Sequence, residues 1–333
     1  MRLVQLSSNA VRRVAVVEEP NLHFLSGVSS IYELALQAIR KKASLSACIA
    51  EIRSNDPLAY DEVYANRSSW SLLPAFDHPY EASRCLVSGT GLTHLGSAKD
   101  RNAMHNLQPD QLTDSMRIFQ SGLEGGKPEE GCIGPAPEWF YKGNGNILRA
   151  HGEPLIVPPY AEDGGEEAEV AACYVVSEDG TPFRVGMATG NEFSDHVFEK
   201  KNYLNLAGSK LRTCALGPEL VINPDFNSVP GTVRLQREGQ TIWSSSIRTG
   251  ENEMCHSLRN IEHHHFKFER HRTPGDAHVH YLGAGLLSFG AGVRLQEGDV
   301  MEIAYDGFGR PLRNAVHWFP QENNTLVTVT PLG

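Results

Sequence analysis

The spacing of apolar residues predicts two kinds of structure along the chain. In residues 1–80, a capping-box pattern at Ser30 and Glu33 precedes apolar residues at helical spacing, which predicts a helix over residues 30–42. We also expect two short strands, at residues 3–6 and 13–17, and a second helix at residues 45–52. We therefore expect residues 1–80 to form a small α+β domain.

Residues 81–333 show a different pattern, in which glycines alternate with short β-branched runs. This pattern is typical of a sheet-rich domain with many turns, and residues 233–243 predict a hairpin around Glu238-Gly239. The other expected strands are these: 85–94 (running into a glycine loop), 139–142, 155–159, 170–176, 183–188, 214–222, 281–289 and 300–305. Helices are expected at 110–120 and 252–265, and a turn at 206–210.

An acidic loop leads into the apolar strand expected at residues 170–176. Glu167 and Glu169 stand where the loop enters the strand, and residues i and i+2 of a strand point to the same face. Their carboxylates would lie side by side, ~7 Å apart at the backbone. Two like charges at the mouth of a core are costly unless a cation lies between them, and a hard divalent ion meets this need. The alternative is a solvated strand end whose acids face water.

Two further residues could join this site. Glu192 follows Thr189-Gly190-Asn191, where glycine lets the backbone turn sharply. Three carboxylates suit Mg²⁺ or Mn²⁺, whereas zinc prefers histidine or thiolate ligands. Lys210 could fix an anionic substrate, or act as a base if it is partly desolvated. Taken singly, Glu192 could also be a surface acid and Lys210 an ordinary turn lysine.

Histidines offer a competing metal site. Adjacent residues in His263-His264-His265 would point about 100° apart on a helix and share an ion poorly. His278 and His280 would share a strand face and are the better pair, although hydrogen-bonded or solvated histidines are the more usual outcome. The sequence contains no nucleophile elbow, phosphate-binding loop or complete dinucleotide-binding glycine motif.

Composition narrows the class of protein. The formal net charge of -10 argues against a nucleic-acid or anionic-membrane partner. The chain has no apolar run long enough for a transmembrane helix and no signal-peptide pattern at its start. Its six cysteines are scattered without zinc-type spacing, so we expect a reducing, cytoplasmic setting.

These motifs together resemble the fumarylacetoacetate hydrolase family over residues 83–316. The resemblance rests on Glu167-Ala168-Glu169-Val170-Ala171, on Asn191-Glu192, and on Lys210 ahead of Leu216-Gly217-Pro218. The family has aspartate where this chain has Glu192, and Leu282-Gly283-Ala284 replaces a turn that usually carries hydroxyls. The phrases at 190–196 and 209–218 are similar to the sugar-acid branch, which includes 2-keto-3-deoxy-pentonate dehydratases and diketo-acid hydrolases.

The resemblance implies a mixed β-roll over residues 81–333. With the smaller N-terminal α+β domain expected over 1–80, which lies outside the resemblance, the predicted fold class is α+β. It also implies a homodimer and Mg²⁺ or Mn²⁺ as cofactor. The implied activity is dehydration of a 2-keto-3-deoxy-pentonate to 2,5-dioxopentanoate. The alternatives are C–C bond hydrolysis of a 2,4-diketo acid and non-catalytic sugar-acid binding.

The resemblance also implies roles for individual residues. The implied metal ligands are Glu167, Glu169 and Glu192; the implied catalytic residues are Lys210, His94 and Glu199; the implied substrate-binding residues are Lys142, Arg101, Gly283 and Ala284. Lys210 would be the base or would hold the water that acts as base. His94 would be the acid and Glu199 would orient water.

Overall fold

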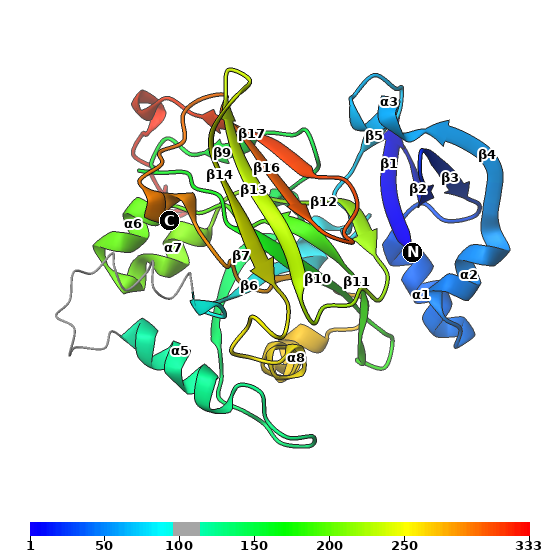
Figure 1. The fold of residues 1–333 in the computed structure, drawn as a ribbon, viewed down its shortest axis with the longest axis horizontal. Coiled ribbons are helices and arrows are strands. Elements are labelled where there is room, and N and C mark those ends of the chain that lie inside the picture. Colours follow the sequence, from blue (N-terminus) through cyan, green and yellow to red (C-terminus); the bar gives the residue numbers. More distant parts are fainter. Residues whose placement is uncertain (96–113) are drawn as a thin grey trace.

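The fold is described from a computed structural model of the chain, over residues 1–95 and 114–333. In these residues the strands form two sheets, of twelve and five strands, that lie against each other (Figure 1). The larger sheet runs in the order β4-β3-β2-β1-β12-β11-β10-β15-β6-β7, with β5 paired to β1 and β8 paired to β12 outside this order. The smaller sheet runs in the order β14-β13-β16-β17-β9. The predicted α+β class is confirmed.

The strands have the following bounds: β1 Arg2–Ser8, β2 Val11–Glu18, β3 Asn21–Leu25, β4 Arg53–Ala59, β5 Ser71–Leu72, β6 Cys85–Gly91, β7 Glu138–Asn144, β8 Leu148–Arg149, β9 Leu155–Val157, β10 Ala168–Val176, β11 Pro182–Asn191, β12 Cys214–Val221, β13 Val229–Arg237, β14 Gln240–Thr249, β15 Ala277–Tyr281, β16 Val300–Tyr305 and β17 Leu312–Trp318. The α-helices have these bounds: α1 Ile31–Lys41, α2 Leu45–Ile52, α3 Tyr60–Tyr64, α5 Asp114–Gly125, α6 His196–Lys201, α7 Leu206–Lys210 and α8 Leu258–Phe266.

Helix α1 forms where the sequence predicts it, because its cap and its apolar face agree. The Ser30 side chain accepts a hydrogen bond from the backbone N–H of Glu33, while the Glu33 carboxylate accepts from the backbone of Ser29. The residues of its buried face are Ile31, Tyr32, Leu34, Ala35 and Ala38. They pack into the same core cluster as residues of β10, β11 and β12.

The N-terminal residues are joined to the rest of the chain through the larger sheet. Strand β1 pairs antiparallel with β12, and β2, β3 and β4 extend the sheet beyond it. A buried carboxylate reinforces this junction: Glu219 on β12 accepts hydrogen bonds from Arg2, Tyr60 and the backbone of Arg310. The sheet therefore runs without a break past residue 80, and the domain boundary drawn there stays a prediction.

The central hairpin β10–β11 positions the acidic residues. Every residue of β10 is buried, between β11 on one side and β15 on the other. Ala168 at the start of β10 pairs with Asn191 at the end of β11. The loops that flank these two residues therefore meet at one edge of the hairpin.

Several of the predicted elements are wrong in detail, and the helix expected over 252–265 begins only at Leu258. The strand expected over 281–289 ends at Tyr281, and residues 282–287 form no strand because this segment turns at Gly283, which has a positive φ of 97°. The turn expected at residues 206–210 is the short helix α7. No helix among the described residues is long and apolar enough to span a membrane.

Three of the histidines that competed as a metal site, His265, His278 and His280, lie together in a buried cluster where α8 packs on β15. His280 contacts the hydroxyls of Ser88 and Thr90 at 2.8 and 2.7 Å, and His265 Nε2 lies 3.1 Å from His278 Nδ1. Burial, together with a smaller effect of neighbouring histidines, lowers the pKa of His278 and His280 to about 3. These rings therefore stay neutral in the folded protein at neutral pH.

This cluster predicts a specific sensitivity to acid. Below pH ~6.5 the unfolded chain binds protons on histidines that the fold keeps neutral, so stability falls as the pH is lowered toward 3. Each such histidine contributes about 1.4 kcal/mol per pH unit. We expect His280→Gln to make the loss of unfolding free energy between pH 6 and 4 shallower by about that slope, as measured by denaturant titration.

The exposed His263, on the same helix, provides the control. His263→Gln should leave the slope of the parent protein unchanged. An unchanged slope in His280→Gln would show that the cluster does not cause the acid sensitivity.

Candidate active site

Three carboxylates from two adjacent strand ends meet in the interior. Glu167 and Glu169 flank Ala168, the first residue of β10, and Glu192 follows Asn191, the last residue of β11. The backbone N–H of Glu192 donates to the carbonyl of Glu167 at 2.9 Å, and one ligand oxygen from each carboxylate lies within 4.8 Å of the others. The three side chains are 8%, 1% and 0% exposed, so the alternative of a solvated strand end is wrong.

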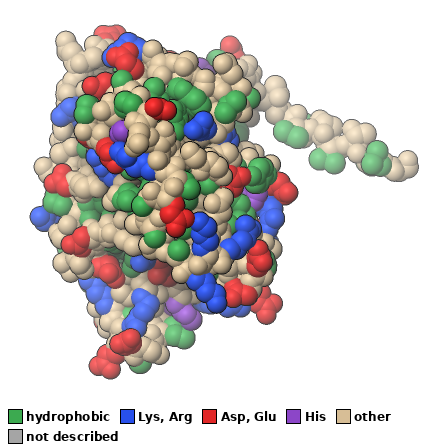
Figure 2. Space-filling view, turned by 90° about the vertical axis from the view of Figure 1, so that its right-hand side faces the viewer, with side chains coloured by type: hydrophobic (Ala, Val, Ile, Leu, Met, Phe, Trp, Pro, Cys, Tyr) green, Lys and Arg blue, Asp and Glu red, His purple; other side chains and the backbone are tan. Residues whose placement is uncertain are grey.

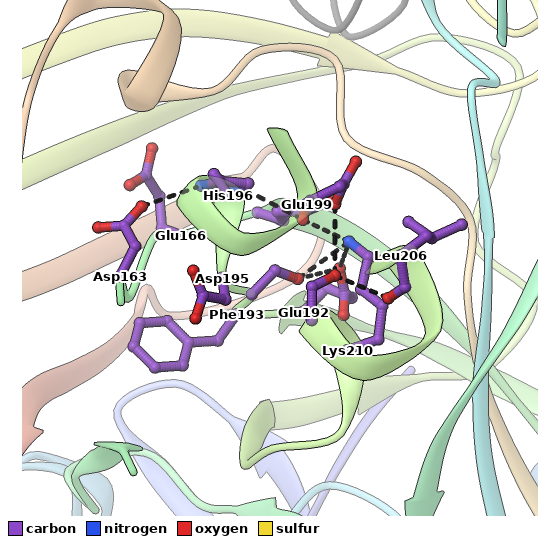
Figure 3. Close-up of polar contacts among 12 residues, drawn as sticks. Asp163, Glu166, Glu192, Phe193, Asp195, His196, Glu199, Leu206 and Lys210 are labelled. Atoms are coloured by element: carbon purple, nitrogen blue, oxygen red, sulfur yellow. Dashed lines mark hydrogen bonds and ion pairs between the residues drawn. The ribbon is translucent and has the colours of Figure 1, made fainter. Parts of the chain in front are cut away.

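Lys210, at the end of α7, places its ammonium group among these carboxylates (Figure 3). Its Nζ donates to Glu167 Oε1 and Glu192 Oε2, both at 2.5 Å, and to the Ser194 hydroxyl at 2.9 Å. It also lies 4.8 Å from the centre of the Phe140 ring. Burial alone would lower the pKa of Lys210, but the two carboxylates outweigh it and raise the pKa, so Lys210 is a cation.

Lys142, on β7, supplies a second buried ammonium group. Its Nζ donates to Glu192 Oε1, to the Phe193 carbonyl at 3.1 Å and to the Lys210 carbonyl at 2.9 Å. An ammonium group has three N–H donors, and the protein uses all three. In this arrangement Lys142 neutralises the site from inside, and the substrate-binding role predicted for it stays a prediction.

The carboxylates are not electrostatically equivalent. Burial raises the pKa of Glu167, but Lys210 and His196 more than offset this and hold it well below the usual value. Burial and the charges of Glu192 and Glu167 raise the pKa of Glu169 well above the usual value. Glu169 has no lysine or arginine at ion-pair distance among the described residues, so it lacks the direct cationic partner that the other two have.

These residues fit a hard divalent cation. All donors are carboxylate oxygens, and their 4.8 Å span is close to the ~4 Å across an octahedral Mg²⁺ site with ligands at ~2.1 Å. The Lys210 ammonium already bridges Glu167 and Glu192, which shows that the position between them suits positive charge. Glu169 is the carboxylate left without a cation. Carboxylate oxygens suit Mg²⁺ and Mn²⁺ alike.

The glycine turn after β15 closes the site beside Glu169. The backbone N–H of Gly283 donates to Glu169 Oε2 at 2.7 Å, and a Cβ on Gly283 would lie 1.9 Å from the Thr93 hydroxyl oxygen. Ala284 is buried with Leu287 in a small apolar cluster. The turn thus provides a backbone donor whose partner in this structure is Glu169, and the substrate-binding role of Gly283 and Ala284 stays a prediction.

The remaining predicted residues lie at different places around the site. Burial lowers the pKa of His94 to about 4, and its ring contacts the hydroxyls of Thr93 and Thr249 at 2.8 and 3.1 Å. Glu199 is buried on α6, close enough that its charge raises the pKa of Lys210 (Figure 3). Arg101 lies outside the described residues.

Sequence reasoning missed several buried residues that support the acids. Ser194 bonds both Lys210 and Glu192, and the ring of His196 contacts Glu167. Their signal was available, because both lie within the phrase 190–196 and follow Glu192 at i+2 and i+4. Asp163 and Glu166 gave no such signal, because only the folded loop places them near the site.

The fold is shared with solved structures of a 2-keto-3-deoxyarabinonate dehydratase and of a fumarylacetoacetate hydrolase, as the resemblance predicted. No protein-family profile matches this sequence, and no curated protein sequence matches it. Several solved structures are similar to this chain in three dimensions. Their sequence identity to it is below 20%, so the similarity establishes a shared fold and nothing more.

Three solved structures illustrate the range of activities on this fold, and each is matched over 96% of this chain. A 2-keto-3-deoxy-D-arabinonate dehydratase complexed with magnesium and 2,5-dioxopentanoate matches over 100% of its own chain, with a TM-score of 0.70 and 18% identity. A 5-carboxymethyl-2-hydroxymuconate delta-isomerase from Mycobacterium smegmatis matches over 99% of its own chain, with a TM-score of 0.59 and 16% identity. A fumarylacetoacetate hydrolase from Exiguobacterium antarcticum matches over 100% of its own chain, with a TM-score of 0.59 and 16% identity.

The unequal carboxylates predict opposite effects of two similar substitutions. Because the raised pKa of Glu169 favours its neutral form, Glu169→Gln should leave the melting temperature at pH 7 equal to or above that of the parent. Glu167→Gln removes a charged partner of the buried Lys210 and should lower the free energy of unfolding by about 3 kcal/mol. Both should abolish the rise in melting temperature that Mg²⁺ causes in the parent, as measured by thermal unfolding.

An unchanged Mg²⁺ effect in both variants would contradict the metal site. Equal destabilisation by the two variants would contradict the electrostatic difference between Glu167 and Glu169.

Proposed function

We propose that this chain is a Mg²⁺-dependent dehydratase that converts a 2-keto-3-deoxy-pentonate, of the arabinonate or xylonate type, to 2,5-dioxopentanoate. The observation that carries the proposal is the buried cluster of Glu167, Glu169 and Glu192 with Lys210 among them. The fold shared with a dehydratase solved with magnesium and 2,5-dioxopentanoate supports the same substrate class.

The charge of the site suits an anionic substrate once a divalent cation is bound. Counted as ionised groups, the three carboxylates exceed the ammonium groups of Lys142 and Lys210 by one negative charge. A bound Mg²⁺ would supply Lewis-acid polarisation of the C2 carbonyl, which makes the C3 proton of a 2-keto acid more acidic. With two more positive charges the site attracts a carboxylate instead of repelling it.

Within this site the residues have distinct tasks. The raised pKa of Lys210 favours holding the substrate or a water over acting as a neutral base. We assign to Glu199, buried beside it, the orientation of the water that accepts the C3 proton. His94 is assigned the role of the acid that gives a proton to the C4 hydroxyl, which then leaves as water. The product tautomerises to 2,5-dioxopentanoate. A substrate contact to Lys210 replaces one of its three internal hydrogen bonds.

The second candidate is metal-dependent hydrolysis of a C–C bond in a 2,4-diketo acid. The fold shared with the fumarylacetoacetate hydrolase from Exiguobacterium antarcticum favours it. Both reactions use the same polarised 2-keto group, so the carboxylate cluster serves either one. The products separate them.

The test supplies purified protein and Mg²⁺ with a 2-keto-3-deoxy-pentonate and, separately, with an acylpyruvate. We expect 2,5-dioxopentanoate from the first and no pyruvate from the second. Removal of the metal with a chelator should abolish the activity, and Glu192→Gln should lower kcat/KM by about 100-fold or more. Glu162→Gln is the matched control, because Glu162 is an exposed acid of the neighbouring loop, paired with Lys201 at the surface.

If the acylpyruvate yields pyruvate, the proposed dehydratase activity is wrong and the hydrolase activity takes its place. Activity that survives both the chelator and Glu192→Gln would overturn the metal mechanism for either substrate.

A further inference from the structure

A buried histidine lies between one of the implied metal ligands and a second carboxylate. His196 is the first residue of α6 and is 2% exposed (Figure 3). Its Nε2 lies 3.2 Å from Glu167 Oε1, the same oxygen that accepts a hydrogen bond from Lys210. Both contacts therefore fall on one oxygen of Glu167, which leaves its other oxygen available to a cation.

The ring of His196 has little freedom to turn. On one side, a Cβ on Gly165 would lie 2.3 Å from Nδ1 and 2.5 Å from Cε1, so the ring lies directly against the Gly165 backbone. On the other side, the centre of the Phe289 ring lies 5.0 Å away. Phe289 itself belongs to the segment that Glu166 holds through the Ser288 backbone and hydroxyl, at 2.8 and 2.7 Å.

The second ring nitrogen faces one oxygen of the Asp163 carboxylate that has no hydrogen-bond partner among the described residues. Nδ1 of His196 lies 3.9 Å from Asp163 Oδ2, and both atoms are buried without a hydrogen-bond partner among the described residues. Asp163 is held in place through its backbone carbonyl, which accepts from Arg212 at 2.7 Å. Two buried polar atoms that face each other in this way point to a chain of contacts from Asp163 through His196 to Glu167.

We propose that His196 is a positioning residue for the cation site, held by Asp163, and that it aims Glu167 at the ion. This inference rests on the metal site of the proposed function and adds residues that no part of the sequence pattern assigned to it. Side chains that orient a metal ligand typically affect metal affinity by about 10–100-fold when they are removed.

Two variants separate the hydrogen bond from the packing of the ring. His196→Phe keeps a ring between Gly165 and Phe289 but has no donor, whereas His196→Gln has no ring but carries an N–H at about the place of Nε2. We expect His196→Phe to weaken Mg²⁺ binding by about 10–100-fold in titration calorimetry and to alter the Mn²⁺ paramagnetic resonance spectrum. His196→Gln should restore most of both.

The surface pair of His317 and Glu297, 3.0 Å apart, provides the matched control. His317→Phe should bind Mg²⁺ as the parent does. Asp163→Asn should weaken binding less than His196→Phe, because it leaves the His196–Glu167 contact in place.

The outcomes are distinguishable from those of the proposed function. Parent-like Mg²⁺ binding by His196→Phe, or equal losses in His196→Phe and His196→Gln, would overturn the positioning role. A parent protein that binds Mn²⁺ but does not dehydrate the substrate overturns the proposed function, while the binding data still decide on His196. A parent that binds neither Mg²⁺ nor Mn²⁺ overturns both.

Discussion

Buried negative charge is the constraint around which this structure is arranged. Glu167, Glu169 and Glu192 are removed from water at the edge of the central hairpin, and ionised groups in such a place need opposite charge close by. Lys142 and Lys210 meet part of this need, from strand β7 and from helix α7. Glu169 has no such partner among the described residues, and the resulting imbalance supports the divalent cation site that we propose for this cluster.

The packing of the fold explains how such a cluster is kept in register. The acids stand at the ends of β10 and β11, which pair with each other along nearly their whole length, and β10 is buried in the larger sheet. The smaller sheet packs against this hairpin, and residues of β13, β14 and β16 form one apolar cluster with residues of β10 and β11. At the C-terminal end, residues 324–333 are exposed, and Figure 2 shows one extended segment that projects from the body.

The fold alone does not select the reaction. Solved structures that share it include a dehydratase, an isomerase and a hydrolase. In the proposed function, the acidic cluster would hold the cation that polarises the 2-keto group. Glu199 on α6 and His94 after β6 would then meet the parts of the substrate beyond C2 and so select the reaction.

The sequence by itself determined those features of the fold and the site that depend on residues close together in the chain. Helix α1 follows from its cap and apolar spacing, and the proximity of Glu167 and Glu169 follows from their i, i+2 separation at a strand end. The tertiary structure alone decided what depends on distant segments: the donors of Lys142 are all used inside the protein, and Asp163 and His196 lie behind Glu167. These contacts join residues up to 68 positions apart, as between Lys142 and Lys210. No local spacing encodes such pairs, because the pairing of the strands and the packing of α6 and α7 bring them together.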